Sequence, residues 1–297
     1  MLVLTLVAVV VQEVIADNAT STASVTNVVP VSSAVSIDGG AASITLTENT
    51  TKNVVVTATV TDNNGCEDID SVSVKFFRTD LTSTGADDSN HRYTQAATLV
   101  GGTCTAGGSD LSANYTATIA VQYYADPTDA GSANEATDWS AEVTPADGSG
   151  GTAGANDTIE MATLTALNVT ADIAYGELAL SADTGTTDKT STITNTGNES
   201  IGVQVDGYEG DGAHTGTDTS MSCTIGTIPI GNEKYSTTTA VDWDTKDALT
   251  HTAATVTGFT VAQRTDGVTT DDIYWGFGMP ANGVSGDCKG TIVFTVI

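Results

Sequence analysis

Basic side chains are scarce in this sequence. It has nine Lys and Arg against 37 Asp and Glu, which gives a formal net charge of −28 at pH 7 and a pI near 4.1. A charge of this size and sign repels nucleic acid and anionic lipid headgroups. The composition therefore argues against nucleic acid as a partner. It favours a protein that stays soluble at high surface density or in concentrated salt, and it attracts divalent cations.

Side chains for acid–base and nucleophilic catalysis are equally scarce. The three histidines (His91, His214 and His251) are scattered, and the sequence has no Gly-x-Ser-x-Gly, His-Glu-x-x-His, phosphate-loop or dinucleotide-binding motif. Carboxylate pairs such as Asp242/Asp244 and Asp271/Asp272 are what an acidic composition produces on solvated loops. We therefore expect no catalytic residues, and the sequence does not predict an enzyme.

Aromatic residues make up only 5 % of the chain, whereas Thr and Val are abundant. Thr and Val favour pleated strands, and the alternation of Asn114–Tyr124 is typical of a strand with one buried face. Asp62-Asn63-Asn64-Gly65 carries the Asn-Gly signature of a turn between two strands. Trp139 is the best candidate for a buried core aromatic. The chain is predicted to be mainly β.

The strand-and-turn rhythm divides into two β modules. A Gly, Ala, Ser and Asp stretch between Pro145 and Ala155 predicts a surface loop near the end of the first module. We expect an apolar N-terminal segment over residues 1–22, a first sandwich over residues 23–165 and a second sandwich over residues 166–297, because regular turn signals are what a sandwich requires.

Four cysteines are too few for a small disulfide scaffold, but they are divided evenly between the two halves of the chain. Cys66 and Cys104 lie in the first half and Cys223 and Cys288 in the second. Four cysteines allow three connectivities, of which one bridge per half is the simplest. A zinc site is not supported, because no two cysteines lie within four residues of each other.

The N-terminal segment Met1–Ala16 is apolar and contains no Lys or Arg. A secretory signal peptide opens with positive charge and is removed, so we expect this segment to be retained, in a membrane or in the core of a polymer. A helix of sixteen residues rises only about 24 Å, whereas a bilayer span takes about 20 apolar residues. Burial among copies of the same chain is therefore favoured, through the side chains of Leu2, Val3, Leu4, Leu6, Val7, Val9, Val10, Val11, Val14 and Ile15.

Two other interpretations of this segment stay open. A less favoured interpretation is the apolar part of a signal peptide that ends near Ala16. Because Val3–Val11 is rich in β-branched residues, it also fits a strand donated to a neighbouring subunit. The helix is favoured over the strand because the apolar run is continuous instead of alternating.

The sequence contains two kinds of candidate surface site. Asn-x-Ser/Thr sequons make glycosylation candidates of Asn18, Asn49, Asn114, Asn156, Asn168 and Asn198. No organic cofactor is indicated, and calcium is the one ligand worth testing because it binds several oxygens from loops. The candidate ligands are Asp206, Glu209 and Asp211 in one Gly-rich loop, and a second group, Asp62, Glu67, Asp68 and Asp70, around a turn; neither has EF-hand spacing.

The order of these parts resembles that of archaeal type IV pilins and archaellins, in which an apolar N-terminal helix precedes exposed β domains. The β region is similar to the tandem Ig-like modules of surface proteins from archaea and small-genome bacteria, in the stretches Val56–Asp70, Ile193–Gly207 and Ile273–Val296. One departure is Thr5, where bacterial type IV pilins usually carry Glu. The resemblance implies a helical core of the archaeal kind.

The resemblance implies a structural subunit of an extracellular, cell-surface pilus-like filament, whose partner is a second copy of the same chain. Its acidic Ig-like sandwiches, with any attached glycans, would form the outer surface and contact other cells or surfaces. One alternative is a secreted or membrane-tethered Ig-like adhesin whose N-terminus is a signal or an anchor. A second alternative is a fibre assembled by strand donation. An enzyme built on a sandwich is the least favoured class.

Overall fold

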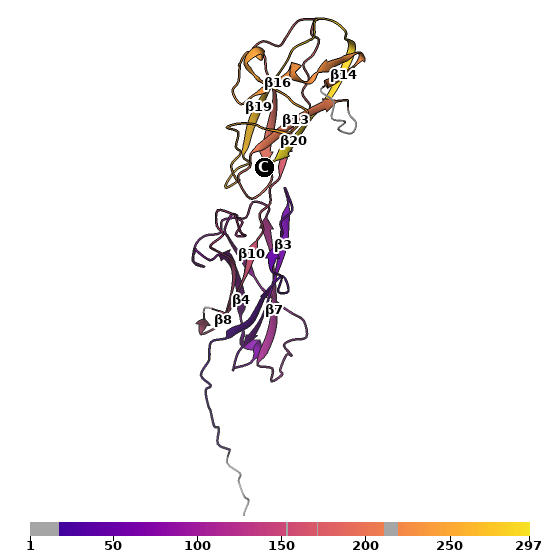
Figure 1. Ribbon diagram of the computed structural model, residues 1–297. Coiled ribbons are helices and arrows are strands. Elements are labelled where there is room, and N and C mark those ends of the chain that lie inside the picture. Colours follow the sequence, from indigo (N-terminus) through magenta and orange to yellow (C-terminus); the bar gives the residue numbers. More distant parts are fainter. Residues whose placement is uncertain (1–17, 153, 171, 211–218) are drawn as a thin grey trace, which may run out of the picture.

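The computed structural model describes residues 18–152, 154–170, 172–210 and 219–297. Its strands form two β-sandwiches that follow one another along an elongated molecule (Figure 1). The helices of the described ranges are three short 3₁₀ turns, η1 (Cys66–Asp68), η2 (Ile230–Asn232) and η3 (Trp243–Thr245). None of them has the length and apolarity that crossing a bilayer requires. The chain is mainly β, as its composition predicts.

The first sandwich has two sheets. Their orders are β1-β3-β7-β6 and β2-β10-β8-β4-β5, with β9 paired to β8. The strands are β1 (Val31–Ile37), β2 (Ser43–Ile44), β3 (Thr51–Thr61), β4 (Ser71–Arg78), β5 (Arg92–Ala96), β6 (Thr98–Leu99), β7 (Ser112–Gln122), β8 (Trp139–Asp147), β9 (Gly150–Gly151) and β10 (Asn156–Met161).

This strand order is the immunoglobulin order. Immunoglobulin domains have strands A, B, E and D in one sheet and strands C, F and G in the other. The strands β1, β3, β7 and β6 take the first four positions, and β4, β8 and β10 take the last three. β2 adds a parallel pairing to β10. The first module is therefore Ig-like by topology.

The core of the first sandwich comes from the alternating strands. Val54, Val56 and Val60 of β3 are buried, and β3 pairs with β7 without a register shift along its whole length. Trp139 is 0 % exposed, and its ring centroid lies 4.8 Å from that of Phe76. The prediction that Trp139 is a core aromatic is confirmed.

The second sandwich also has two sheets. Their orders are β11-β12-β19-β16-β17 and β15-β14-β20-β13-β18. The strands are β11 (Leu167–Val169), β12 (Lys189–Asn195), β13 (Val203–Glu209), β14 (Thr219–Ile225), β15 (Thr227–Pro229), β16 (Glu233–Ser236), β17 (Asp247–Ala248), β18 (Ala254–Thr255), β19 (Thr270–Phe277) and β20 (Ser285–Val296). The second aromatic centre is Trp275, which packs against Tyr235 with centroids 5.6 Å apart.

Strand β13 extends further than the sequence indicates. The sequence predicts a Gly-rich loop that contains Asp206 and Glu209, but β13 runs to Glu209 and pairs with β20 from Val203 to that residue. Gly207 permits this extension of β13, because a Cβ at this position would lie 2.4 Å from the Leu249 side chain. The glycine permits close packing within a strand and does not mark a loop.

Candidate functional sites

The residues predicted to drive polymerisation, from Leu2 to Ile15, lie outside the described residues. The described chain begins with the connector Asn18–Val28, all of which is exposed. Val25 in this connector is 86 % exposed. An exposed connector therefore separates the apolar segment from the first strand of the first sandwich (Figure 1).

The four cysteines form two disulfides, one in each sandwich. Cys66 is bonded to Cys104, and Cys223 is bonded to Cys288. The second bridge joins opposite residues of β14 and β20. Disulfides persist in oxidising compartments, so the pair is typical of a protein outside the cytosol.

The six sequons do not have equal exposure. Asn18, Asn49, Asn114, Asn156 and Asn168 are exposed, as a glycan attachment site must be. Asn198 is 0 % exposed, so its identification as a glycosylation candidate is wrong for the folded protein. Its side-chain nitrogen donates hydrogen bonds to the carbonyl oxygens of Ala125 and Ala162.

The predicted calcium ligands of the Gly-rich loop do not converge. Asp206 and Glu209 both lie on β13, and residues three apart on a strand point to opposite faces of the sheet. Asp211 lies outside the described residues. This candidate group is therefore corrected: the two described carboxylates belong to a strand and do not form a loop site.

The second predicted group is partly brought together. Asp62 and Asp68 approach each other, and Asp147 from β8 joins them. Glu67 and Asp70 are not part of the cluster: the Glu67 carboxylate accepts a hydrogen bond from the Gly107 amide, and Asp70 is exposed. Asp147 was missed because it is far away along the chain, and only the pairing of β8 with β4 places it beside this turn.

The side chain of Asn198 forms hydrogen bonds that join the two sandwiches. It lies between β12 and β13 of the second sandwich, whereas Ala125 and Ala162 belong to the end of the first. The two hydrogen bonds that it donates measure 3.0 and 3.1 Å. Its side-chain oxygen accepts from the Leu164 amide at 2.7 Å. Three of the four hydrogen-bonding positions of the Asn198 side chain are thus filled by backbone groups at the junction.

A second set of contacts crosses the junction from the loop between β18 and β19. Gln263 donates to the Tyr124 carbonyl and to the Asp126 carboxylate, both at 3.0 Å. The Arg264 guanidinium lies 4.5 Å from the centroid of the Tyr124 ring, a cation–π distance. Asn90 donates to the Arg264 carbonyl at 2.8 Å. The junction is therefore built from polar contacts with specific partners.

Asp126 is the buried charge of this junction. It is 8 % exposed and accepts a hydrogen bond from Arg78. Burial raises the pKa of Asp126, and the hydrogen bond from Gln263 and the positive charge of Arg78 act in the opposite direction. The Trp139 indole donates to the Asp126 backbone oxygen at 2.9 Å, so the core of the first sandwich holds this loop in place.

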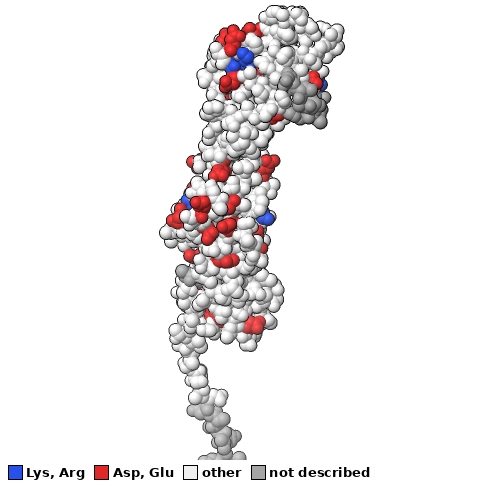
Figure 2. Space-filling view, in the orientation of Figure 1, with Lys and Arg blue, Asp and Glu red and all other residues white. Residues whose placement is uncertain are grey.

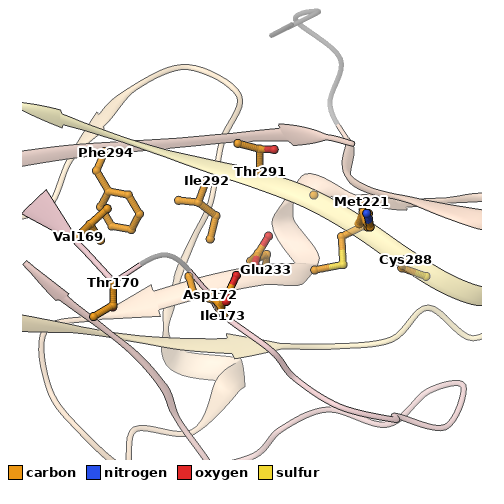
Figure 3. A pocket seen from close by; sticks show the side chains of 12 residues that line it. Val169, Thr170, Asp172, Ile173, Met221, Glu233, Cys288, Thr291, Ile292 and Phe294 are labelled. Carbon is orange, nitrogen blue, oxygen red and sulfur yellow. The ribbon is translucent and has the colours of Figure 1, made fainter. Parts of the chain in front are cut away.

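The second sandwich has a cavity of about 350 Å³ between its sheets. Figure 3 shows Ile292 and Phe294 of β20 and Met221 of β14 along it, with Glu233 below β20. Glu233 is 3 % exposed and accepts a hydrogen bond of 2.8 Å from the Tyr175 hydroxyl. Burial raises the pKa of Glu233 to about 7, and the Tyr175 hydrogen bond acts against this rise.

No family model and no curated protein matches this sequence. Among solved structures, the chain is similar to one in a complex of Acinetobacter baumannii, described as the CsuC–CsuE chaperone–tip adhesion subunit pre-assembly complex from archaic chaperone-usher Csu pili. The identity is 12 % and the TM-score 0.35, over 86 % of this chain and 96 % of that one. It is also similar to the C-terminal domain of the Streptococcus agalactiae AgI/II polypeptide BspA, at 12 % identity and a TM-score of 0.24, over 90 % and 95 % of the chains.

The sheet topology itself defines the class of protein. The chain is a tandem β-sandwich protein with one disulfide per sandwich and a polar, hydrogen-bonded junction. The β-sandwich is a common architecture of cell-surface domains. The fold alone does not define an activity, because function depends on the sites that a fold carries.

Proposed function

We propose that this protein is the repeating subunit of an extracellular filament, with Met1–Ala16 as the polymerising element and the two sandwiches as the outer surface. The observation that carries this proposal is the exposed connector Asn18–Val28. Eleven residues in extended form reach about 35–40 Å. This length allows the apolar segment to pack among copies of itself while each sandwich keeps a core made of its own strands.

Burial of the apolar segment supplies enough free energy for a polymer. Each buried Leu or Val side chain contributes roughly 1.5–3 kcal/mol. The ten Leu, Val and Ile residues of the segment therefore supply on the order of 15–30 kcal/mol gross per subunit, before the cost of ordering the chains.

The sandwiches contribute less to cohesion because of their charge. Acidic side chains are spread over both modules on the face shown in Figure 2, and the whole chain carries −28. Like-charged surfaces repel unless salt or cations screen them. Lateral contacts should therefore strengthen with ionic strength. The exposed sequons add positions at which glycans would cover the same surface.

A charge within the apolar segment tests this proposal. We expect Val7→Asp to abolish filaments, because an unpaired carboxylate would have to be buried in the polymer core. The matched control is Val25→Asp, which adds the same charge at a connector position that is 86 % exposed. Electron microscopy and sedimentation measure assembly, and circular dichroism and thermal unfolding show whether both sandwiches remain folded.

Two outcomes would contradict the proposal. Filaments of normal diameter from Val7→Asp would show that polymerisation does not depend on this segment. Equal loss of filaments in Val25→Asp would point to a general effect of charge. The alternative of a single, unpolymerised surface adhesin predicts that the wild-type chain does not form filaments under any salt condition.

In the strand-donation alternative, the cavity of the second sandwich is the place where the apolar strand of another copy would bind. Its lining includes Met221, Ile292 and Phe294, and an apolar strand from another copy would find apolar contacts there. A double variant Val7→Cys, Met221→Cys distinguishes the two modes, since the described cysteines are all paired. An intermolecular cross-link between the new cysteines supports strand donation, and intact filaments without it support the helical core.

A further inference from the structure

Three carboxylates from separate elements meet at the end of the first sandwich that is remote from the junction. Asp62 follows β3, Asp68 ends η1 and Asp147 ends β8. One oxygen of each lies within 4.8 Å of the others. The strands β3 and β8 belong to different sheets, so the cluster bridges the two layers of the sandwich.

Two of these carboxylates have a buried oxygen without a partner. Asp62 is 1 % exposed, and its Oδ2 is buried and has no hydrogen-bond partner, as is also true of the Asp68 Oδ2. Among the described residues, no Lys, Arg or His forms an ion pair with Asp62, Asp68 or Asp147. Buried charges without a partner are costly, and three that face one another also repel. A bound cation would therefore remove both costs.

Backbone amides already hold the carboxylates of Asp62 and Asp147 in place. The Asp62 Oδ1 accepts from the Asn64 amide at 2.7 Å. The Asp147 Oδ1 accepts from the amides of Ser149 and Gly150 at 2.7 and 3.1 Å. These hydrogen bonds orient two of the carboxylates before any ion arrives, which lowers the ordering cost of binding.

We propose that Asp62, Asp68 and Asp147 form a calcium site. Calcium binds six to eight oxygens at 2.3–2.6 Å, whereas magnesium requires near-octahedral geometry at 2.0–2.1 Å. The three oxygens lie within 4.8 Å of one another, and two oxygens on opposite sides of one calcium ion lie about 4.6–5.2 Å apart, so a single calcium ion can contact all three carboxylates. Magnesium also gives up its water shell reluctantly, so calcium is the favoured ion. Water and backbone oxygens would complete the calcium shell.

The site is connected to the N-terminal connector. Asn27 donates to the Asp147 Oδ2 at 3.3 Å. Asn64, whose amide binds Asp62, accepts from the Val28 amide at 2.7 Å and donates to the Thr26 carbonyl. A bound ion would therefore fix the point at which the connector enters the first sandwich. This inference does not depend on filament assembly.

Calcium titration of the full chain tests the site. With CaCl₂ at a hundred times the Kd, and NaCl adjusted to constant ionic strength, we expect the Tm of the first sandwich to rise by about 5–10 °C. Calorimetric titration should give one ion per chain. Hydrogen exchange at the amides of Val28 and Asn64 should slow with calcium. Magnesium should give a smaller shift.

Matched variants make the result specific. Asp62→Asn and Asp68→Asn should each weaken calcium binding at least tenfold and remove the Tm rise. In EDTA both should melt no lower than the wild type, because each removes repulsion. Glu160→Gln, an exposed position of β10, should keep the wild-type response. The site is overturned if the wild type shows no calcium-dependent Tm shift, or if Glu160→Gln loses as much of the shift as Asp62→Asn.

Discussion

Glu233→Gln is expected to stabilise the second sandwich by about 3 kcal/mol at pH 8 and to leave its stability nearly unchanged near pH 4. The cause is burial, which raises the pKa of Glu233 from 4.5 to about 7. The folded protein keeps the Glu233 proton up to about pH 7, whereas the unfolded chain releases it near pH 4.5. A neutral amide at this position does not pay the penalty of burying a charge.

The sign of the pH dependence follows from this difference in proton binding. Between about pH 4.5 and 7 the folded state binds more protons than the unfolded state, so the free energy of unfolding falls as the pH rises. Above about pH 7 the contribution of Glu233 is constant. The difference in Tm between Glu233→Gln and the wild type should therefore grow across this window, to roughly 10 °C.

Thermal unfolding of both proteins from pH 4 to 9 measures this difference in Tm. The contributions of the titrating groups that the two proteins share cancel in it. Glu177→Gln is the control, because Glu177 is exposed in the same sandwich. Tyr175→Phe should raise the pKa of Glu233 further, since the Tyr175 hydroxyl donates to its carboxylate. A pH-independent difference between Glu233→Gln and the wild type would refute the raised pKa.

The strands were predictable where one face is buried. The buried Val54, Val56 and Val60 of β3 alternate with more exposed residues, and period-two alternation reports this directly. The extension of β13 was not predictable, because Asp206 and Gly207 have a local preference for turns. Pairing with β20 overrides that preference. Propensity fails where a long-range partner supplies the hydrogen bonds.

From the sequence, candidate ligands could be grouped only where they lie close to the same turn along the chain. Asp62 and Asp68 could be grouped because they lie on either side of the same turn, whereas Asp147 arrives through sheet pairing. The sequon at Asn198 shows the opposite error. Its three-residue pattern is correct, but burial at the junction makes the side chain inaccessible. A short sequence motif identifies the residue types that a modification needs, but it does not show whether their side chains are exposed.

Asn198→Ala is expected to destabilise the protein by about 3–6 kcal/mol. The substitution leaves the carbonyl oxygens of Ala125 and Ala162 and the amide of Leu164 without their side-chain partner. Each buried backbone group left unsatisfied costs about 1–3 kcal/mol, and water entering the gap recovers part of that cost. Denaturant unfolding measures the loss, and Asn168→Ala, at an exposed position, is the control that should change stability by less than about 0.5 kcal/mol.

Asn198→Ala and a second variant, Asn198→Asp, together test whether Asn198 joins the two sandwiches or only stabilises one of them. Asn198→Asp keeps an acceptor for the Leu164 amide but loses both donors, and it places a carboxylate against two carbonyl oxygens. It should therefore cost at least as much as the alanine variant. Because the lost partners belong to the first sandwich and the junction, small-angle scattering of either variant under native conditions should show a wider range of angles between the modules. An unchanged scattering curve, together with a loss of stability confined to the second sandwich, would mean that Gln263, Arg264 and Asn90 hold the junction without Asn198.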